Sequence, residues 1–332
     1  MQSLKSRYDI FDFLVKKINN VTHKINCLDK SSNDIFELFY YYYYYGKYQY
    51  KLTNLNIFLI KVIGEQSLMG TIYLSKFKNY KFITKIILLN YFSIKELEIT
   101  EKLSNIAYKN KNIHLPLLYG HSLCNKINIE LKLLDDEKFN PANSYYCLFI
   151  ELYEGSMYLL LIKLFELHKT DYFKYYIYNI IMQCFISILS CHINNIYHND
   201  SHINNFLYCY SQLSYNYKYK YLYNDLEFIV NCQPFIISIC DFGLSNYKND
   251  NNNDDNDNDK FKKDYKILLD SINKYYITKY KLQDIINLDL IYNLLEQSNN
   301  DYELFNNLKK NKFFNDDDNE NENYNEIIIN LV

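Results

Sequence analysis

The stretch HNDSHINN, residues 198–205, decides the fold assignment because it places a polar cluster between two apolar segments. The segment before it, 177–193, and the run after it, 206–210, are of the kind that proteins bury. Leaving a polar group buried without a partner costs on the order of 2–7 kcal/mol. Such a cluster at such a junction is therefore either a surface loop or a functional site, and the rest of the chain distinguishes the two.

The spacing within this stretch has the form HxDxxxxN, and an aspartate, Asp241, follows later in the triplet DFG. Asp200 and Asn205 on one loop can serve different ends of a reaction, the first facing a hydroxyl nucleophile and the second a metal ion. Asp241, entering from the next hairpin, would complete a pair of oxygen ligands of the kind that Mg²⁺ prefers. The pattern indicates a site that handles a hydroxyl group and a magnesium ion.

Glycine is scarce, with six in the chain, so its positions are informative. Gly64 and Gly70 bracket the turn IGEQSLMG between two segments that have β-strand character. Backbone N–H groups of such a turn can cover phosphate groups, and Lys85 on the following strand would project beneath them. Taken alone this signal is weak, because most lysines on strands bind no ligand.

In combination and in this order, the motifs resemble those of the eukaryotic protein kinases. The match runs through the glycine-bounded turn, Lys85, the acidic helix KELEITEKLSN (95–105), the hinge-like CLFIELYEGSM (147–157), the histidine pair of CHINNIYHND (191–200), Asn205 and DFG (241–243). The resemblance covers about 57 to 290. Within that family, the chain resembles the divergent serine/threonine kinases of large DNA viruses and the haspin-like kinases.

The resemblance implies an α+β, two-lobed protein-kinase-like fold with a small antiparallel β-rich N-lobe and a larger, mainly helical C-lobe. The kinase-like domain would span 51–332, with a hinge at 151–155 that separates the N-lobe from the C-lobe. Residues 1–50 would form an N-terminal extension, helical first and tyrosine-rich later. The Asn/Asp-rich run 249–260 is too polar to pack and is expected to be disordered.

Local patterns predict several individual elements. Three short β-rich segments, 56–64, 70–77 and 80–89, predict an antiparallel meander. A helix is predicted over 93–109, where Ser93 can cap it, and a second helix where Ile177, Ile181, Cys184 and Ile188 keep helical spacing. The segment KKDYKILLDSI (262–272) is predicted to form the next core helix, and YKYKYLYN (217–224) a strand pair in the insertion between Asn205 and Asp241.

The resemblance also implies roles for individual residues. Asp200 looks like the catalytic base that accepts the substrate hydroxyl proton, while Asn205 and Asp241 look like the magnesium ligands. Lys85 would hold the α- and β-phosphates of ATP, oriented by a helix glutamate. Glu96 fits that helix best, and Glu98 and Glu101 remain alternatives.

The nucleotide site implied by the resemblance lies in the cleft between the lobes. Hinge backbone groups from Glu151 to Tyr153 would contact adenine, and the side chains of Ile63 and Ile72 would pack on its faces. The backbone from Gly64 to Gly70 would cover the phosphates.

Three departures from the kinase pattern bear on activity and substrate. The glycine-bounded turn lacks a middle glycine. Asn199 replaces the arginine that usually precedes the catalytic aspartate, so control through a phosphorylated loop is not expected. His202 stands where many serine/threonine kinases have a lysine that reaches toward the transferred phosphate. The sequence predicts a protein serine/threonine kinase. Two alternatives remain: a pseudokinase scaffold that binds partners without catalysis, and a small-molecule phosphotransferase of the aminoglycoside or choline kinase type, which His202 favours.

Histidine pairs could also suggest other chemistry. His192 is predicted to pack at the end of its helix rather than to act as a catalyst. The spacing of His198 and His202 could suit zinc, but no following glutamate or third ligand is nearby in the sequence, so no zinc site is expected.

The chain has 332 residues, 48% of them apolar, and a net charge of −3. This charge argues against nucleic acid or an anionic membrane as the main partner, so the partner is expected to bind in a cleft. Eight cysteines without a CxxC pair suit a reduced, intracellular compartment. This compartment would be the cytoplasm or, for a viral protein, the host cell or the virion.

The longest apolar stretch, 176–193, is interrupted by polar residues, so no transmembrane helix is expected. Arg7 is the single arginine of the chain.

Overall fold

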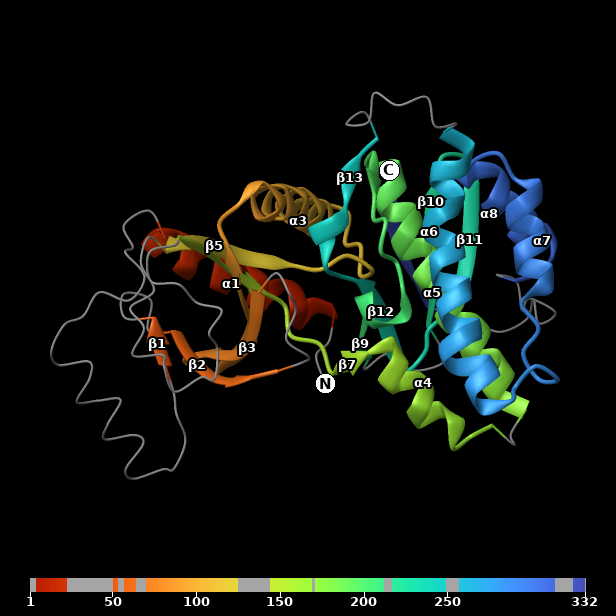
Figure 1. Cartoon of the computed structure of the whole chain (residues 1–332), viewed down its shortest axis with the longest axis horizontal. Helices are drawn as coiled ribbons and strands as arrows, with labels where there is room; N and C mark the ends of the chain where they lie inside the picture. The colour runs from red at the N-terminus through yellow and green to blue at the C-terminus, as the bar shows by residue number, and fades with distance from the viewer. Residues whose placement is uncertain are drawn as a thin grey trace, which may run out of the picture. The chain divides into compact units, whose positions relative to one another are not determined.

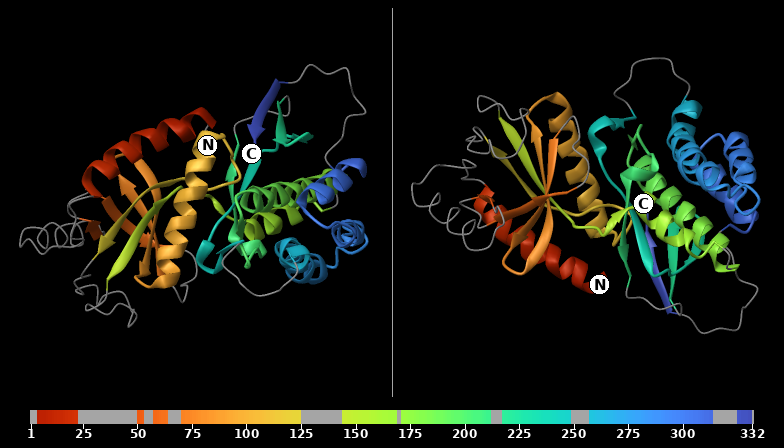
Figure 2. Two further views of the ribbon diagram at one scale, coloured as in Figure 1. Left: turned by 90° about the horizontal axis from the view of Figure 1, so that it is seen from above. Right: turned by 60° about the horizontal axis from the view of Figure 1, so that its bottom comes forward.

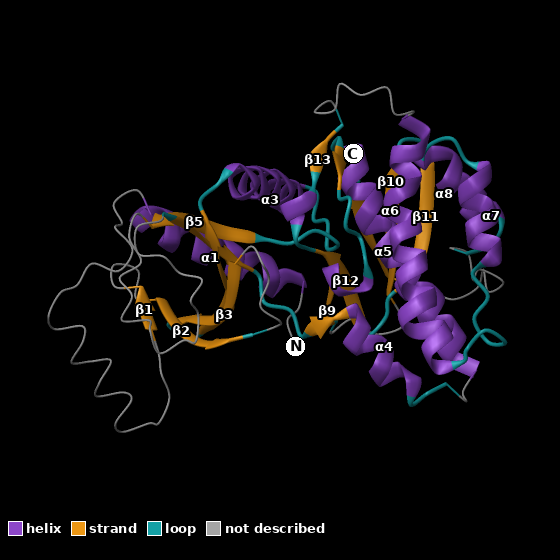
Figure 3. Ribbon diagram, in the orientation of Figure 1, coloured by secondary structure: helices purple, strands orange, loops and turns teal. Residues whose placement is uncertain are grey.

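The computed structural model describes residues 4–22, 50–52, 57–63, 70–124, 144–168, 171–211, 217–248, 257–313 and 325–331. Two compact units divide the chain. The sheet unit consists of Lys5–Glu101 and Leu117–Leu152, and the helical unit consists of Met1–Leu4, Lys102–Pro116 and Tyr153–Val332. Strands predominate in the first unit and helices in the second (Figures 1 and 3). The predicted α+β class is confirmed.

The sheet unit contains one six-stranded sheet in the order β1-β2-β3-β4-β6-β5, with every neighbouring pair antiparallel. The meander predicted from three β-rich segments is observed as β2, β3 and β4. The register pairs Lys85 with Ile72 on one side and with Leu148 on the other, so the lysine lies in the middle of the sheet. The strands are β1 (Tyr50–Leu52), β2 (Ile57–Val62), β3 (Gly70–Phe77), β4 (Tyr80–Leu88), β5 (Leu118–Cys124) and β6 (Tyr145–Ile150).

Helix α3 (Tyr91–Lys109) follows β4 and begins with a reciprocal cap. The Ser93 backbone N–H donates to Asn90 Oδ1, and the Asn90 backbone N–H donates to Ser93 Oγ, both at 2.9 Å. Two N–H groups that the first turn leaves without helical partners are thereby satisfied. The sequence predicted a helix over 93–109 capped by Ser93; the cap is Asn90, and Ser93 is the second half of the box.

Helices α1 and α3 lie on opposite faces of the sheet (Figure 2). On the α3 side, Leu97 packs with Ile87, Leu118 and Leu148. On the other side lies α1 (Leu4–Thr22), whose buried residues Tyr8, Phe11, Leu14 and Ile18 recur at helical spacing. Both faces of the sheet are therefore covered.

The helical unit is built around α5 (Asp171–Ile193). Among helices in the described parts of the chain, the segment Tyr172–Ile193 alone has the length and hydropathy to cross a membrane, and 83% of its apolar window is buried inside the protein. Such burial is typical of a core helix. The other helices are α4 (Met157–Phe165), α6 (Asp257–Ile272) with a π-helical continuation (Asn273–Thr278), α7 (Asp289–Gln297) and α8 (Asp301–Lys310).

Short strands form three small sheets in the helical unit. One sheet has the strand order β12-β9-β7, and another is the pair β13-β8. Strand β8 directly precedes the 198–205 loop, and β9 directly follows it. The third sheet, in the order β11-β10-β14, contains the hairpin predicted in the insertion between Asn205 and Asp241. The strands are β7 (Gly155–Ser156), β8 (Ile196–Tyr197), β9 (Phe206–Tyr210), β10 (Tyr217–Tyr223), β11 (Leu226–Asn231), β12 (Phe235–Ile239), β13 (Asn246–Tyr247) and β14 (Asn325–Asn330).

The insertion hairpin is anchored rather than extended into solvent. Tyr219 and Tyr221 are buried, and Tyr221 Oη lies 2.6 Å from His114 Nε2. The other nitrogen of His114 lies 2.6 Å from the carbonyl oxygen of Ile237 in β12. One buried histidine therefore joins the insertion to the strand that leads into Asp241.

Helix α1, in the predicted N-terminal extension, belongs to the sheet unit. One sequence prediction differs from the structure at a polar segment. Helix α6 begins at Asp257, so the last four residues of the run 249–260, expected to be disordered, are helical. The rest of that run, together with Gly64 and the tyrosine run 40–45, lies outside the described residues.

Candidate active site

A buried ion pair lies in the sheet unit where the sequence placed the phosphate-binding lysine. Lys85 Nζ donates to Glu96 Oε1 at 2.6 Å, and the two residues are 5% and 4% exposed. Glu98, one of the alternatives, is exposed, and Glu101, the other, pairs with His121 Nδ1 at 2.9 Å. Of the three glutamates considered, the structure pairs Glu96 with the lysine.

This ion pair contributes little to stability in net terms. Removing two charges from water costs several kcal/mol for each ion, and apolar residues of similar volume often stabilise a core equally well or better. The neighbours of Lys85 on its face of the sheet include Ile87 and Leu148, which form an apolar core with Leu97. A buried charged pair in such a place marks a candidate functional site.

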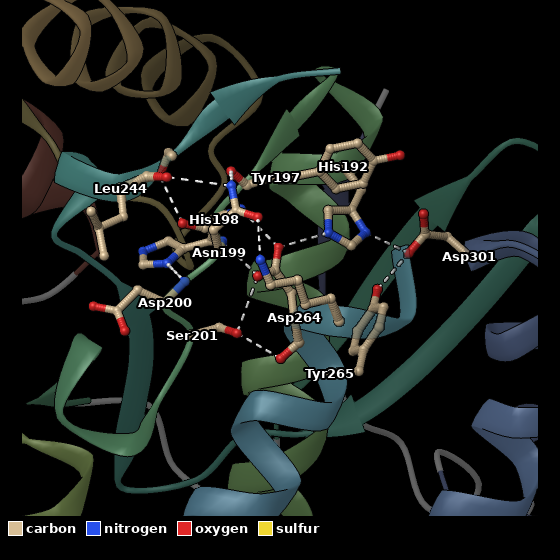
Figure 4. Close-up of polar contacts among 12 residues, drawn as sticks. His192, Tyr197, His198, Asn199, Asp200, Ser201, Leu244, Asp264, Tyr265 and Asp301 are labelled. Carbon is tan, nitrogen blue, oxygen red and sulfur yellow. Dashed lines mark hydrogen bonds and ion pairs between the residues drawn. The ribbon is translucent and has the colours of Figure 1, made fainter. Parts of the chain in front are cut away.

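In the helical unit, Asp264 on α6 organises the 198–205 loop (Figure 4). Its carboxylate accepts the backbone N–H groups of His198 and Asn199, each at 2.7 Å. The Ser201 hydroxyl donates to the Asp264 carbonyl at 2.6 Å. One side chain therefore fixes the backbone immediately before Asp200. The sequence singled out this helix as a core element but did not identify Asp264.

His192 lies against the same carboxylate. Its Nε2 is 3.1 Å from Asp264 Oδ2, and its Nδ1 is 2.9 Å from Asp301 Oδ1. Burial alone would lower the pKa of His192, but the two carboxylates outweigh burial and raise it to about 10. Burial likewise tends to raise the pKa of Asp264, and the hydrogen bond from His192 holds it below its usual value. The prediction that His192 packs at its helix end agrees with this position.

Asp200 is held and yet remains accessible. Asn205 Nδ2 donates to the Asp200 carbonyl at 2.8 Å and to its carboxylate at 3.0 Å. The Asp200 side chain is 36% exposed, and His202 Nε2 lies 3.6 Å from Asp200 Oδ2. His202 Nδ1 accepts the Asn204 N–H at 3.2 Å, so neutral His202 carries its proton on Nε2. A proton donor and a fixed carboxylate thus lie side by side on one loop.

The two predicted metal ligands are brought together by one antiparallel pair. Phe206 opposes Ile239 in the β9–β12 pairing, and the Cys240 N–H donates to the Asn205 carbonyl at 2.8 Å. Asn205 therefore precedes β9 at the end of the pair where Asp241 follows β12. Asp241 is exposed and has a left-handed backbone, with φ of 63°.

The side-chain oxygens of Asn205 and Asp241 are ligands of the kind that magnesium binds. One carboxylate and one amide oxygen are hard ligands, which Mg²⁺ prefers together with water and phosphate oxygens. Since Asn205 Nδ2 donates to Asp200, its Oδ1 is directed elsewhere and can accept a cation. Among the described residues no three His, Cys, Asp or Glu side chains gather as a metal site, so the ion would depend on phosphate oxygens for further ligands.

The predicted adenine- and phosphate-contacting residues occupy defined places. The Ile63 N–H donates to the Ile72 carbonyl at 2.9 Å, which brings these two residues together at the ends of β2 and β3. Gly70 has a packing reason of its own, because a Cβ there would clash with the Ile86 carbonyl of β4. Tyr153 is the first residue of the helical unit after β6.

Glu151 has a role that the sequence did not indicate. Its carboxylate forms a buried, two-bond ion pair with Arg7 on α1: Nε to Oε1 at 2.6 Å and Nη2 to Oε2 at 2.7 Å. Its backbone N–H donates to the Leu117 carbonyl at 2.9 Å. The uniqueness of Arg7 in the chain was the one available signal, and no sequence pattern indicates its partner.

Comparison with known proteins gives a limited result. No family model and no curated protein sequence matches the chain. Among solved structures, a crystal structure of the kinase domain of PF14_0431 matches with a TM-score of 0.37 and 16% sequence identity, over 59% of this chain and 53% of that chain. The likeness thus spans about half of that kinase domain.

Proposed function

We propose that the protein is a protein kinase that uses ATP and Mg²⁺ and transfers the γ-phosphoryl group to serine or threonine of a protein substrate. The observation that carries this proposal is the buried pair of Lys85 and Glu96 in the sheet unit. An ammonium group fixed by a carboxylate in an apolar surrounding is a strong site for phosphate oxygens, since charges interact more strongly away from water.

The helical unit would supply the remaining groups. Asp200, fixed by Asn205 and still accessible, would accept the proton of the substrate hydroxyl. Asn205 and Asp241 would hold magnesium, which when bound neutralises charge on the phosphates. Phosphoryl transfer needs mainly positioning and charge neutralisation, and the rigidity of the 198–205 loop suits that requirement.

The test is magnesium-dependent transfer of labelled γ-phosphate from ATP to a mixed protein substrate. We expect Asp200→Asn to lower the transfer rate by about 10²- to 10⁴-fold, the usual contribution of a general base. Its matched control is Asp225→Asn, an exposed aspartate in the β10–β11 turn, which should leave the rate unchanged. Equal rates for wild type and Asp200→Asn would contradict the proposed role of Asp200.

A second candidate is transfer to a small hydroxylated molecule, which the position of His202 favours. His202 Nε2 lies 3.6 Å from the Asp200 carboxylate, where the kinase pattern has lysine. The same assay with small hydroxylated acceptors distinguishes the two substrates. If the protein binds ATP and labels neither kind of acceptor, a scaffold without catalysis is the better account.

A further inference from the structure

The ion pair between Arg7 and Glu151 joins the first helix of the sheet unit to the end of its β6 strand. Arg7 and Glu151 are 7% and 5% exposed, so the pair is buried. Both oxygens of Glu151 are used by Arg7, and the Leu117 N–H also reaches Oε2 at 3.4 Å. The planar guanidinium group forms two parallel bonds of this kind, which the ammonium group of lysine cannot form.

The position of this pair matters more than its energy. Glu151 immediately follows β6, and its backbone is tied to Leu117, the residue before β5. The side chain and the backbone of one residue are therefore both fixed, the first to α1 and the second to the neighbouring strand. The backbone of Glu151 is therefore held on two sides at the point where β6 ends.

The contacts of α1 explain how the arginine is held in place. Phe11 packs against Tyr119 with ring centroids 6.1 Å apart, and Phe13 packs against Tyr80 at 5.0 Å. Tyr119 in turn meets Phe82 of β4 at 6.2 Å. The helix is thus attached to two strands, β4 and β5, and presents Arg7 from a rigid element.

We infer that Arg7 is a positioning residue: through Glu151 it fixes the backbone at the end of β6, so α1 is an integral part of the nucleotide site. The part of this inference that concerns nucleotide rests on the proposed function, in which the backbone from Glu151 onward contacts adenine. The part that concerns backbone order stands on the contacts alone.

The experiment compares Arg7→Met with the matched control Lys16→Met, which removes an exposed basic side chain from the same helix. Hydrogen exchange is followed at the Glu151 amide, which is bonded to Leu117, and the dissociation constant of a fluorescent ATP analogue is measured in parallel. For Arg7→Met we expect both the exchange rate and the dissociation constant to rise about tenfold, equivalent to roughly 1.4 kcal/mol. For Lys16→Met we expect neither to change.

The double variant Arg7→Met/Glu151→Met separates positioning from simple destabilisation. Removing both charges takes away the penalty of an unpaired buried carboxylate, so the melting temperature should recover toward that of wild type. Exchange at residue 151 should nevertheless stay fast. If exchange returns to the wild-type rate in the double variant, or does not change in Arg7→Met, Arg7 has no positioning role.

Failure of this inference is distinguishable from failure of the proposed function. If wild type does not bind the ATP analogue, the kinase proposal is contradicted, while exchange at Glu151 still decides whether Arg7 orders the backbone. If wild type binds the analogue and Arg7→Met binds it equally well, the link between α1 and the nucleotide site is wrong.

Discussion

His192 and Asp264 form a buried ion pair in the helical unit, with Nε2 and Oδ2 3.1 Å apart and both side chains almost completely shielded from solvent. Asp264 also holds the backbone of His198 and Asn199. The charge on His192 therefore supports a carboxylate that in turn shapes the 198–205 loop. Through this chain of contacts, the protonation of one histidine affects the geometry around Asp200.

The stability contributed by His192 should depend on pH. Its pKa rises from an ordinary value of 6.5 to about 10 in the folded protein, so the contribution is complete below pH 6.5 and is lost as pH rises toward 10. The loss amounts to at most about 1.4 kcal/mol per pH unit. We expect the difference in unfolding free energy between wild type and His192→Gln to shrink from pH 6 to pH 10 in urea titrations. A difference independent of pH would contradict the buried charge.

The Lys85–Glu96 pair predicts a contrast between two glutamates of α3. Glu96→Gln removes the carboxylate that fixes the lysine, so we expect phosphoryl transfer to fall by at least about tenfold, the effect of losing one charge-assisted hydrogen bond of 1.5–3 kcal/mol. Glu98→Gln, an exposed neighbour on the same helix, should have no effect. The two rates are compared at saturating ATP. Equal losses in both variants would show that α3 acts through its overall charge.

The contacts of Asn199 predict that the transfer activity does not require phosphorylation of the protein itself. Its Nδ2 donates to the carbonyl oxygens of Tyr197 and Leu244 at 3.3 Å each, which ties the segment after Asp241 to the loop without a phosphate group. We expect phosphatase treatment to leave the transfer rate unchanged. Asn199→Gly keeps the backbone φ of 64° accessible but removes these bonds, and should lower kcat about three- to tenfold, equivalent to one hydrogen bond of roughly 1 kcal/mol.

The companion variant Asn199→Ala controls for backbone strain. Alanine disfavours a positive φ by about 1–2 kcal/mol, so the unfolding free energy of Asn199→Ala should be lower than that of Asn199→Gly by that amount. Both variants lose the same side-chain hydrogen bonds. If phosphatase abolishes activity, or if neither variant changes kcat, Asn199 does not hold the segment.

Strand β14 offers a matched pair of adjacent residues. Ile329 is fully buried and Ile328 is 59% exposed, as alternation along a strand requires. A carboxylate at the buried position would lack a partner, so we expect Ile329→Asp to destabilise the protein by at least about 3 kcal/mol. Ile328→Asp should change the unfolding free energy by less than about 0.5 kcal/mol. Thermal unfolding of both variants tests whether β14 contributes to the folded helical unit.

Local patterns were sufficient to predict much of the fold. The short β-rich segments around Ile72 and Lys85, separated by turn-like residues, predicted the meander. The helical spacing of Ile177, Ile181, Cys184 and Ile188 predicted α5. The choice of Glu96 as the partner of Lys85 came from the resemblance and left Glu98 and Glu101 open; the structure pairs the lysine with Glu96.

Long-range contacts were not predictable in this way. The partner of Arg7 lies in β6, far along the chain, and no local pattern indicates which carboxylate a lone arginine meets. The parallel pairing of β10 with β14 depends on two segments separated by the whole of α6, α7 and α8. Asp264 belongs to the same class, because its importance comes from backbone groups of a distant loop, which carry no sequence signal.

The β10–β14 pairing also has a consequence in time. Tyr217 in β10 pairs with Asn325, about a hundred residues later, so the hairpin leaves the ribosome well before its parallel partner exists. At roughly 5–20 residues per second, that delay is on the order of 5–20 s. Throughout it, one edge of β10 has backbone groups with no strand beside them, which is a hazard for pairing with other chains. The nascent chain is therefore exposed to misassembly during the interval between the synthesis of β10 and that of β14.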